Sequence, residues 1–132
     1  MKLRIKDNSI RFRLTKSEVA SLKEYKKVSA TTNFGLRPFE VLEYCLKIEP
    51  KVSNIEAHFN GFRVLVNLPQ NLALQWTSSN QIALMHEQKI SHEQSLKILI
   101  EKDFFCLKPR QNEVEDESDM YENPSVGSSG TC

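Results

Sequence analysis

Basic side chains recur at every second position near the start of the chain and could contact a polyanion. Residues 2–6 and 10–14 alternate apolar and basic residues, a pattern that predicts paired β-strands. Successive side chains of a strand point to opposite faces, so one face would carry Lys2, Arg4, Lys6, Arg11 and Arg13. Such a positive strip suits a phosphate backbone. The alternative is a solvated face whose charges prevent edge-to-edge aggregation.

The other face of this hairpin is expected to meet a core through its apolar residues. Because Phe12 belongs to that apolar face, the basic face lacks the aromatic rings on which single-stranded bases stack. The pattern therefore predicts attraction to a nucleic-acid backbone or another polyanion without recognition of the bases.

A second group of chemically versatile side chains follows the most apolar segment of the chain. Residues 96–100 hold four large aliphatic side chains and predict a buried strand in the middle of a sheet. We consider the residues beyond it a possible site at the strand exit, formed by Lys102, Asp103, Cys106 and Arg110. With a histidine, they could serve a small metal-binding protein or an enzyme. The alternative is a strand that simply leaves the core.

No motif assigns a catalytic residue, a cofactor or a metal. The chain has neither a Gly-x-Ser-x-Gly nucleophile motif nor a glycine-rich phosphate loop. Its three histidines and three cysteines lack the paired spacing of zinc ligands. We therefore expect no cofactor and no metal, and the sequence favours a binding protein over an enzyme.

Charge is distributed unevenly along the chain. Residues 111–132 contain six acidic residues and no lysine or arginine, whereas residues 1–110 carry 18 basic and 11 acidic residues. We predict a single domain over 1–110 and an acidic, disordered tail over 111–132, since the tail has too few apolar residues to fold alone. This tail could shield the basic strip, with an effective concentration that can reach the millimolar range. Alternatively, it could solubilise the chain or dock on a partner protein.

The remaining elements follow from periodicity and turn residues. Thr15 and Glu18 form a capping box that begins a helix over about 16–25, and Pro69 begins a short helix that ends at 78–80. Asn60 and Gly61 predict a two-residue turn that places Phe59 opposite Phe62. Further strands are predicted over 28–34, 39–48 and 82–87.

These elements predict an α+β fold with about eight strands and two short helices. Consecutive strand pairs favour a mostly antiparallel curved sheet or a partly closed barrel. No internal repeat is visible. No run approaches the roughly 18 apolar residues that a membrane span needs. The odd number of cysteines indicates a reducing setting, so we expect a cytoplasmic protein without membrane contact.

A resemblance to a protein family rests first on three segments, 1–6, 10–19 and 101–110. The last of these reads Glu-Lys-Asp-Phe-Phe-Cys-Leu-Lys-Pro-Arg. Together with Leu68-Pro69, Trp76 and pieces of the tail, they resemble a family of small uncharacterised bacterial proteins of unknown function. The resemblance runs over the whole length and implies a free-standing bacterial domain, without any activity to transfer.

The sequence leaves three functional hypotheses. The first is a non-enzymatic cytoplasmic binding or accessory module, with an anion-contacting basic hairpin face that the acidic tail shields. The second is a small metal-binding protein or enzyme that uses the region of Lys102, Asp103 and Cys106. The third is a structural module for protein–protein interaction.

Overall fold

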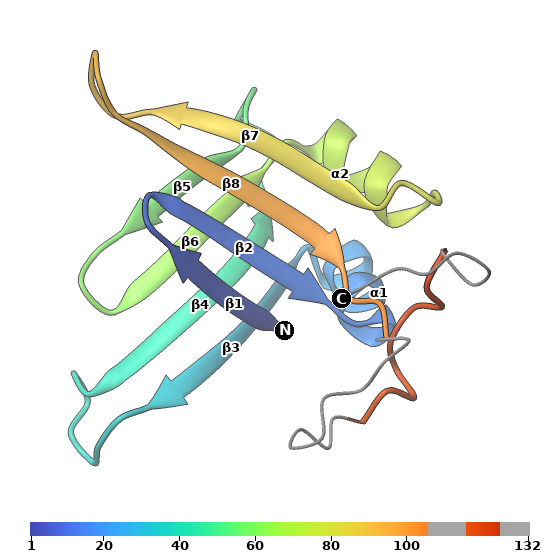
Figure 1. Cartoon of the computed structure of the whole chain (residues 1–132), viewed down its shortest axis with the longest axis horizontal. Helices are drawn as coiled ribbons and strands as arrows, with labels where there is room; N and C mark the ends of the chain where they lie inside the picture. Colours follow the sequence, from blue (N-terminus) through green and yellow to red (C-terminus); the bar gives the residue numbers. More distant parts are fainter. Residues whose placement is uncertain (106–115, 125–132) are drawn as a thin grey trace.

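The computed structural model describes residues 1–105 and 116–124, which contain eight strands and two helices (Figure 1). In chain order these are β1 (Lys2–Lys6), β2 (Ser9–Leu14), α1 (Lys16–Tyr25), β3 (Lys27–Asn33), β4 (Val41–Ile48), β5 (Glu56–Phe59), β6 (Arg63–Leu68), α2 (Gln70–Thr77), β7 (Ala83–Lys89) and β8 (Ser95–Lys102). The predicted α+β class, with its eight strands and two helices, is confirmed.

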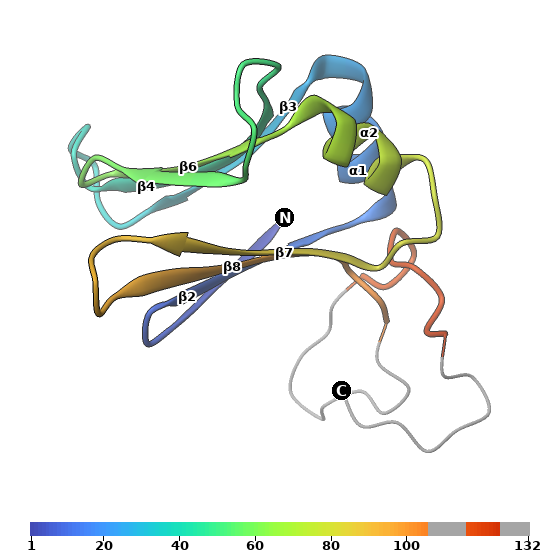
Figure 2. The same ribbon diagram turned by 90° about the horizontal axis from the view of Figure 1, so that it is seen from above.

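The strands form two four-stranded sheets that face each other, with both helices at one end (Figure 2). The orders are β1-β2-β8-β7 and β3-β4-β6-β5. The four hairpin pairs are antiparallel, whereas β2 with β8 and β4 with β6 are parallel. Antiparallel pairing thus predominates as predicted, but the described strands form two mixed sheets and no closed barrel.

Local signals explain why the hairpins and helices begin and end where they do. Asp7 adopts a positive φ of 48° in the two-residue turn between β1 and β2. The capping box of Thr15 and Glu18 starts α1, and Lys26 ends it in the left-handed conformation. The predicted Asn60–Gly61 register is wrong: Phe59 lies opposite Val64. The Asn60 side chain accepts N–H bonds from Phe62 and Arg63, which stabilises a three-residue loop over 60–62 instead.

Apolar side chains from both sheets and both helices fill the space between the sheets. Phe12, Leu46, Val66, Trp76 and Ile100 are fully buried there. The edge strand β5 is tied to the opposite sheet, because the Gln88 side chain of β7 bonds both backbone groups of Ala57, at 2.6 and 3.0 Å. These hydrogen bonds satisfy backbone groups at the edge of β5 and link the two sheets.

The fold consists of two ββαββ units related by approximate two-fold symmetry. The elements β1, β2, α1 and β4 begin at 2, 9, 16 and 41, and β5, β6, α2 and β8 begin 54 residues later at 56, 63, 70 and 95. The registers agree as well. Ser9 lies opposite Lys97 in the pair β2–β8, and the equivalent Arg63 and Glu43 lie opposite each other in β6–β4.

The repeat is hidden in the sequence because matched positions mostly share apolar character rather than identity. Buried pairs at this spacing are Ile10 and Val64, Phe12 and Val66, Leu14 and Leu68, Val19 and Ala73, Leu22 and Trp76, and Leu46 and Ile100. One buried pair breaks the rule. Ile48 in the first unit corresponds to Lys102 in the second, so a cationic side chain occupies a position that the repeat fills with an aliphatic one.

Part of the predicted tail packs on the body. Met120 is buried, the Lys16 N–H donates to the Asp119 carbonyl at 2.9 Å, and the Tyr121 N–H donates to the Asp103 carbonyl at 2.8 Å. Residues 116–124 of the predicted tail therefore pack against the body. This segment has few apolar residues of its own. Hydrophobic contact with the body and backbone hydrogen bonds to the end of β8 stabilise it instead.

Within the described residues, neither helix is long and apolar enough to cross a membrane.

Candidate functional site

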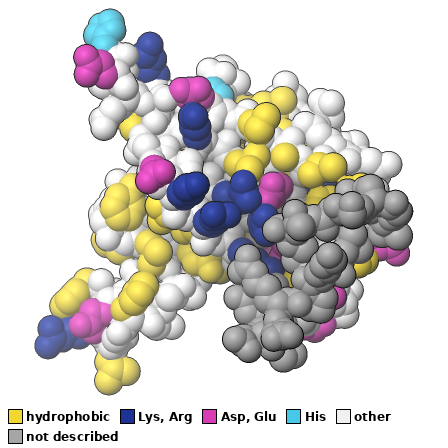
Figure 3. Space-filling model, in the orientation of Figure 1, with side chains coloured by type: hydrophobic (Ala, Val, Ile, Leu, Met, Phe, Trp, Pro, Cys, Tyr) yellow, Lys and Arg dark blue, Asp and Glu magenta, His cyan; other side chains and the backbone are white. Residues whose placement is uncertain are grey.

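The five predicted basic side chains lie on the outer face of the sheet β1-β2-β8-β7, away from the second sheet. The strand register arranges them in cross-strand rows, since Lys2 lies opposite Arg13 and Arg4 lies opposite Arg11. Their side chains are half-buried or exposed, with Lys2 at 41% and Arg13 at 43%. In Figure 3, lysine and arginine side chains gather over β2 and β8 on this face.

The rows continue onto β8 and β7, where the sequence alone did not place further members. Lys97 lies opposite Ser9 of β2, and Lys89 lies at the end of β7. Within the described residues, the strands of this outer face carry seven cations and two carboxylates, Glu87 and Glu101, and Asp103 beyond β8 pairs with Lys2. We call this surface the basic face; its cations are Lys2, Arg4, Lys6, Arg11, Arg13, Lys89 and Lys97.

The two carboxylates neutralise only part of the basic face. Glu101 accepts a hydrogen bond from Arg13 at 2.6 Å, and Arg11 lies 3.7 Å from the same carboxylate. A depression of about 440 Å³ next to Arg11 is also lined by Met85, Glu87 and Lys97 among other residues. Glu101 thus fixes the arginine side chains of β2, while Arg4 and Lys6 of β1 are exposed.

The equivalent outer face of the second sheet provides an internal comparison. The positions of Lys2, Arg4, Lys6, Arg11 and Arg13 correspond there to Glu56, His58, Asn60, Leu65 and Asn67. Three cations and two carboxylates share that face: Lys27, Lys47, Arg63, Glu43 and Glu56. The same architecture therefore does not require a basic outer face.

The residues predicted at the strand exit separate into two groups. Lys102 points inward, where its Nζ lies 5.7 Å from the centroid of the Trp76 ring and 5.5 Å from that of Tyr121. Asp103 is also buried, and its carboxylate lies 2.9 Å from the Nζ of Lys2. The remaining two predicted members, Cys106 and Arg110, lie outside the described residues.

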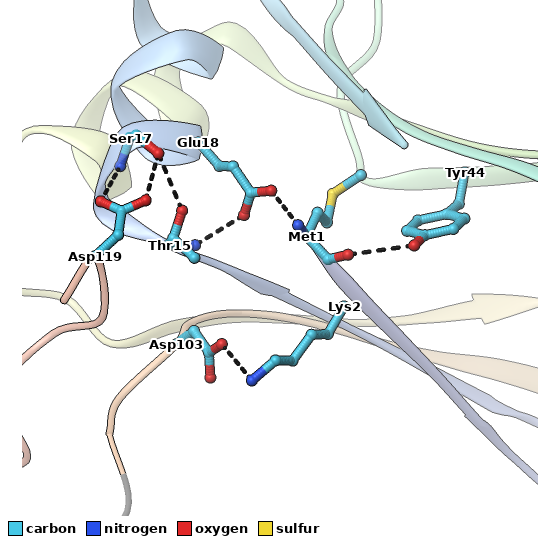
Figure 4. Close-up of polar contacts among 8 residues, drawn as sticks. All are labelled: Met1, Lys2, Thr15, Ser17, Glu18, Tyr44, Asp103 and Asp119. Carbon is cyan, nitrogen blue, oxygen red and sulfur yellow. Dashed lines mark hydrogen bonds and ion pairs between the residues drawn. The ribbon is translucent and has the colours of Figure 1, made fainter. Parts of the chain in front are cut away.

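The Lys2–Asp103 ion pair belongs to a junction of four segments (Figure 4). The Met1 amino group pairs with Glu18, whose other oxygen accepts the Thr15 N–H at 2.9 Å. The Tyr44 hydroxyl donates to the Met1 carbonyl across the sheets at 3.3 Å. The basic face and the strand exit, which the sequence treats as separate features, thus meet at this junction.

The tail contributes Asp119 to the N-terminus of α1. Its carboxylate accepts hydrogen bonds from both the backbone N–H and the hydroxyl of Ser17 (Figure 4). These bonds and that of Thr15 hold the pKa of Asp119 below its ordinary value. The Asp119 carboxylate therefore satisfies a backbone N–H in the first turn of α1, where the helix dipole favours a negative charge.

Replacement of Asp119 by alanine is expected to release residues 116–124 from α1. Since the folded pKa is lowered, the carboxylate stabilises docking at neutral pH, and this contribution is lost as pH falls through that lowered pKa. The Met120 methyl resonance in NMR spectra should therefore shift toward its random-coil position in Asp119→Ala, and in the wild type at acidic pH. The control is Asp116→Ala, because Asp116 bonds only within its own segment, to Ser118. Equal shifts in both variants would contradict a specific role of Asp119.

Burial affects two further groups beside the tail. Desolvation lowers the pKa of Lys102 below that of an ordinary lysine, and desolvation together with Asp119 raises the pKa of Tyr121. Among residues 1–105 and 116–124, no three histidine, cysteine, aspartate or glutamate side chains come close enough to hold a metal ion.

A family model described as a family of unknown function, DUF7009, matches residues 1–125. The chain belongs to this family. The match includes the docked segment 116–124 and ends directly after it. No curated protein and no solved structure matches the chain. The family relationship therefore agrees with the resemblance seen in the sequence and transfers no activity.

Proposed function

We propose that the protein is a non-enzymatic binding or accessory module whose basic face contacts the backbone of a polyanion such as a nucleic acid. The observation that carries this proposal is the difference between the two sheets. One outer face has seven cations against two carboxylates, while its symmetry-related counterpart has three against two. In a bacterial cytoplasm, which we propose as its location, nucleic acids are the abundant polyanions.

The geometry of the basic face suits an extended row of phosphates. Side chains on one face of a strand repeat about every 6.8 Å, and side chains on neighbouring strands are about 5 Å apart. Lysine and arginine side chains at this spacing can each contact a different phosphate. Arg11 and Arg13 are held in place by Glu101, which lowers the entropy that they lose on binding.

Binding of this kind is independent of base sequence and sensitive to salt. The apolar side chains on the basic face are aliphatic, Leu99 and Met85, so it offers no aromatic ring for base stacking. Affinity then arises mainly from counterion release, and its logarithm falls linearly with the logarithm of salt concentration. A protein of this type would be expected to bind single strands of different composition almost equally.

Reversal of two exposed cations on β1 tests the proposal. In Arg4→Glu/Lys6→Glu, the affinity for a fluorescein-labelled single-stranded DNA should fall at least tenfold, and the slope of log Kd against log[NaCl] should decrease by about 2. Fluorescence anisotropy measures both quantities, and earlier elution from heparin should accompany them.

The matched control changes the net charge equally but elsewhere. Lys23 of α1 and Lys51 are exposed and lie off the basic face, so Lys23→Glu/Lys51→Glu should keep most of the affinity. Equal losses in the two double variants would show that only net charge matters. No detectable binding by the wild type at 20 mM salt would refute the proposal.

We further propose that acidic residues of the tail compete with the polyanion for the basic face. Deletion of 111–132 is a poor test, because it would uncover the sites of Met120 and Tyr121. Replacement of Glu113, Glu115, Asp116, Glu117 and Glu122 by their amides leaves Asp119 and the packing intact. This variant should bind DNA more tightly than the wild type, and unchanged affinity would remove the shielding role while leaving the basic face in place.

A further inference from the structure

Lys102 is a buried cation whose equivalent in the first unit, Ile48, is aliphatic. It is 6% exposed, and its counterpart Ile48 in the first unit is 3% exposed. The backbone around the two is equivalent, since the Ile48 N–H donates to the Lys26 carbonyl and the Lys102 N–H donates to the Ile82 carbonyl. The architecture therefore tolerates an apolar residue here, and the lysine has to be explained by something other than the fold.

Within the described part of the chain, no carboxylate compensates the ammonium group of Lys102. It donates one hydrogen bond, to the Ser79 carbonyl, and contacts the faces of Trp76 and Tyr121. Among residues 1–105 and 116–124, no aspartate or glutamate oxygen lies within 4 Å of it. An ammonium has three donors, and a buried cation without a counter-ion is costly, so this site can still accept an anionic partner.

Space for such a partner is present next to Lys102. A pocket of about 500 Å³ opens between the loop after α2 and the docked tail segment, within the range typical of small-molecule sites. Its walls combine the rings of Phe104 and Tyr121, which lie 5.6 Å apart, with the polar residues Ser79 and Asn80 and the acidic residue Glu122. A second cation, Lys16, lies 5.9 Å from the Tyr121 ring at the exposed side of the pocket.

We propose that this pocket binds a small organic oxyanion, a carboxylate or phosphate monoester with an apolar body, with Lys102 as its buried counter-ion. The oxyanion would take the unused donors of Lys102, Lys16 would contribute from the pocket mouth, and the apolar body would lie against Phe104 and Tyr121. Since Tyr121 belongs to the tail, ligand binding and tail docking would stabilise each other. This site is separate from the basic face, because Lys102 points between the sheets.

The single tryptophan of the chain makes the site observable. Trp76 contacts Lys102, so an anion that binds Lys102 should change the intrinsic fluorescence in a saturable way. The probes are acetate, benzoate, inorganic phosphate and phenyl phosphate, each at constant ionic strength with sodium chloride as the reference. Benzoate or phenyl phosphate should bind more tightly than acetate or inorganic phosphate. At a probe concentration ten times its Kd, the melting temperature of the protein should rise by roughly 5 °C.

Substitutions assign the response to the pocket. Lys102→Met should weaken binding at least tenfold, because it removes charged hydrogen bonds, and should leave the unliganded protein at least as stable. Lys16→Met, at an exposed position, should weaken binding roughly threefold without any effect on folding. Arg4→Glu/Lys6→Glu should keep the full fluorescence response, and Lys102→Met should keep its affinity for DNA, so each proposal can fail alone.

The pH dependence provides an independent readout. Lys102 must be protonated to bind an anion, so affinity should fall as pH rises through its lowered pKa. The other charged or titratable groups of the pocket are Lys16 on α1 and Tyr121 and Glu122 on the tail. The loss should be absent in Lys102→Met. A flat fluorescence titration with all four probes, or an unchanged response in both Lys102→Met and Lys16→Met, would overturn the assignment.

Discussion

Replacement of Trp76 by alanine is expected to lower the free energy of unfolding by about 3–5 kcal/mol, the range for loss of a large buried aromatic side chain. Trp76 is fully buried between α2 and the sheets, and its indole N–H donates to the Ile82 carbonyl at 3.2 Å. Its ring also covers the ammonium of Lys102. The substitution therefore removes apolar contact, one hydrogen bond and the partner of a buried cation.

Urea denaturation followed by circular dichroism measures this loss, because the variant has no tryptophan to report by fluorescence. The symmetry of the fold supplies a matched control. Leu22 of α1 occupies the equivalent position in the first unit and is also fully buried, and the position equivalent to Lys102 there is Ile48. Leu22→Ala should cost about 2–5 kcal/mol. In the Lys102→Met background, Trp76→Ala should cost less than in the wild type, whereas the cost of Leu22→Ala should be unchanged.

Features that depend on neighbouring residues could be read from the sequence. The turn at Asp7, the capping box of Thr15 and Glu18, and the starts of both helices are each determined by a few residues close in the chain. The outward position of Arg4 and Arg11 likewise follows from the two-residue period of a hairpin. The Asn60–Gly61 register failed because the Asn60 side chain, rather than a tight turn, stabilises the loop.

Features that depend on distant pairing could not be read in the same way. The parallel pairing of β2 with β8 joins residues 88 positions apart, such as Ser9 and Lys97, and no local pattern specifies it. Lys97 was therefore missed as a member of the basic face. The neighbours of Lys102 were missed for the same reason, since Trp76 comes from α2 and Tyr121 from the tail. A comparison of apolar positions 54 residues apart would have revealed the repeat and the exceptional lysine.

The ion pair between Lys2 and Asp103 is the second contact whose loss should be large. The two residues are far apart in the sequence, near the two ends of the segment 1–105. Their pairing therefore fixes β1 beside the C-terminal end of β8. Asp103 is 2% exposed, and removal of one partner from a buried pair leaves an uncompensated charge. Because the Lys2 side chain is 41% exposed, solvent screens part of the effect, and we expect Lys2→Met to cost about 2 kcal/mol at pH 7.

A double-mutant cycle separates this electrostatic cost from lost packing. Asp103→Asn keeps the shape of the side chain but removes its charge, so no buried carboxylate remains for Lys2 to neutralise. In that background Lys2→Met should cost less than about 0.5 kcal/mol, which gives a coupling energy of about 1.5 kcal/mol. Urea denaturation of the four proteins measures it. Additive costs would mean that Lys2 acts mainly through its aliphatic stem. The junction would then owe its stability to the backbone bonds that Asp103 donates to Leu14 and accepts from Tyr121.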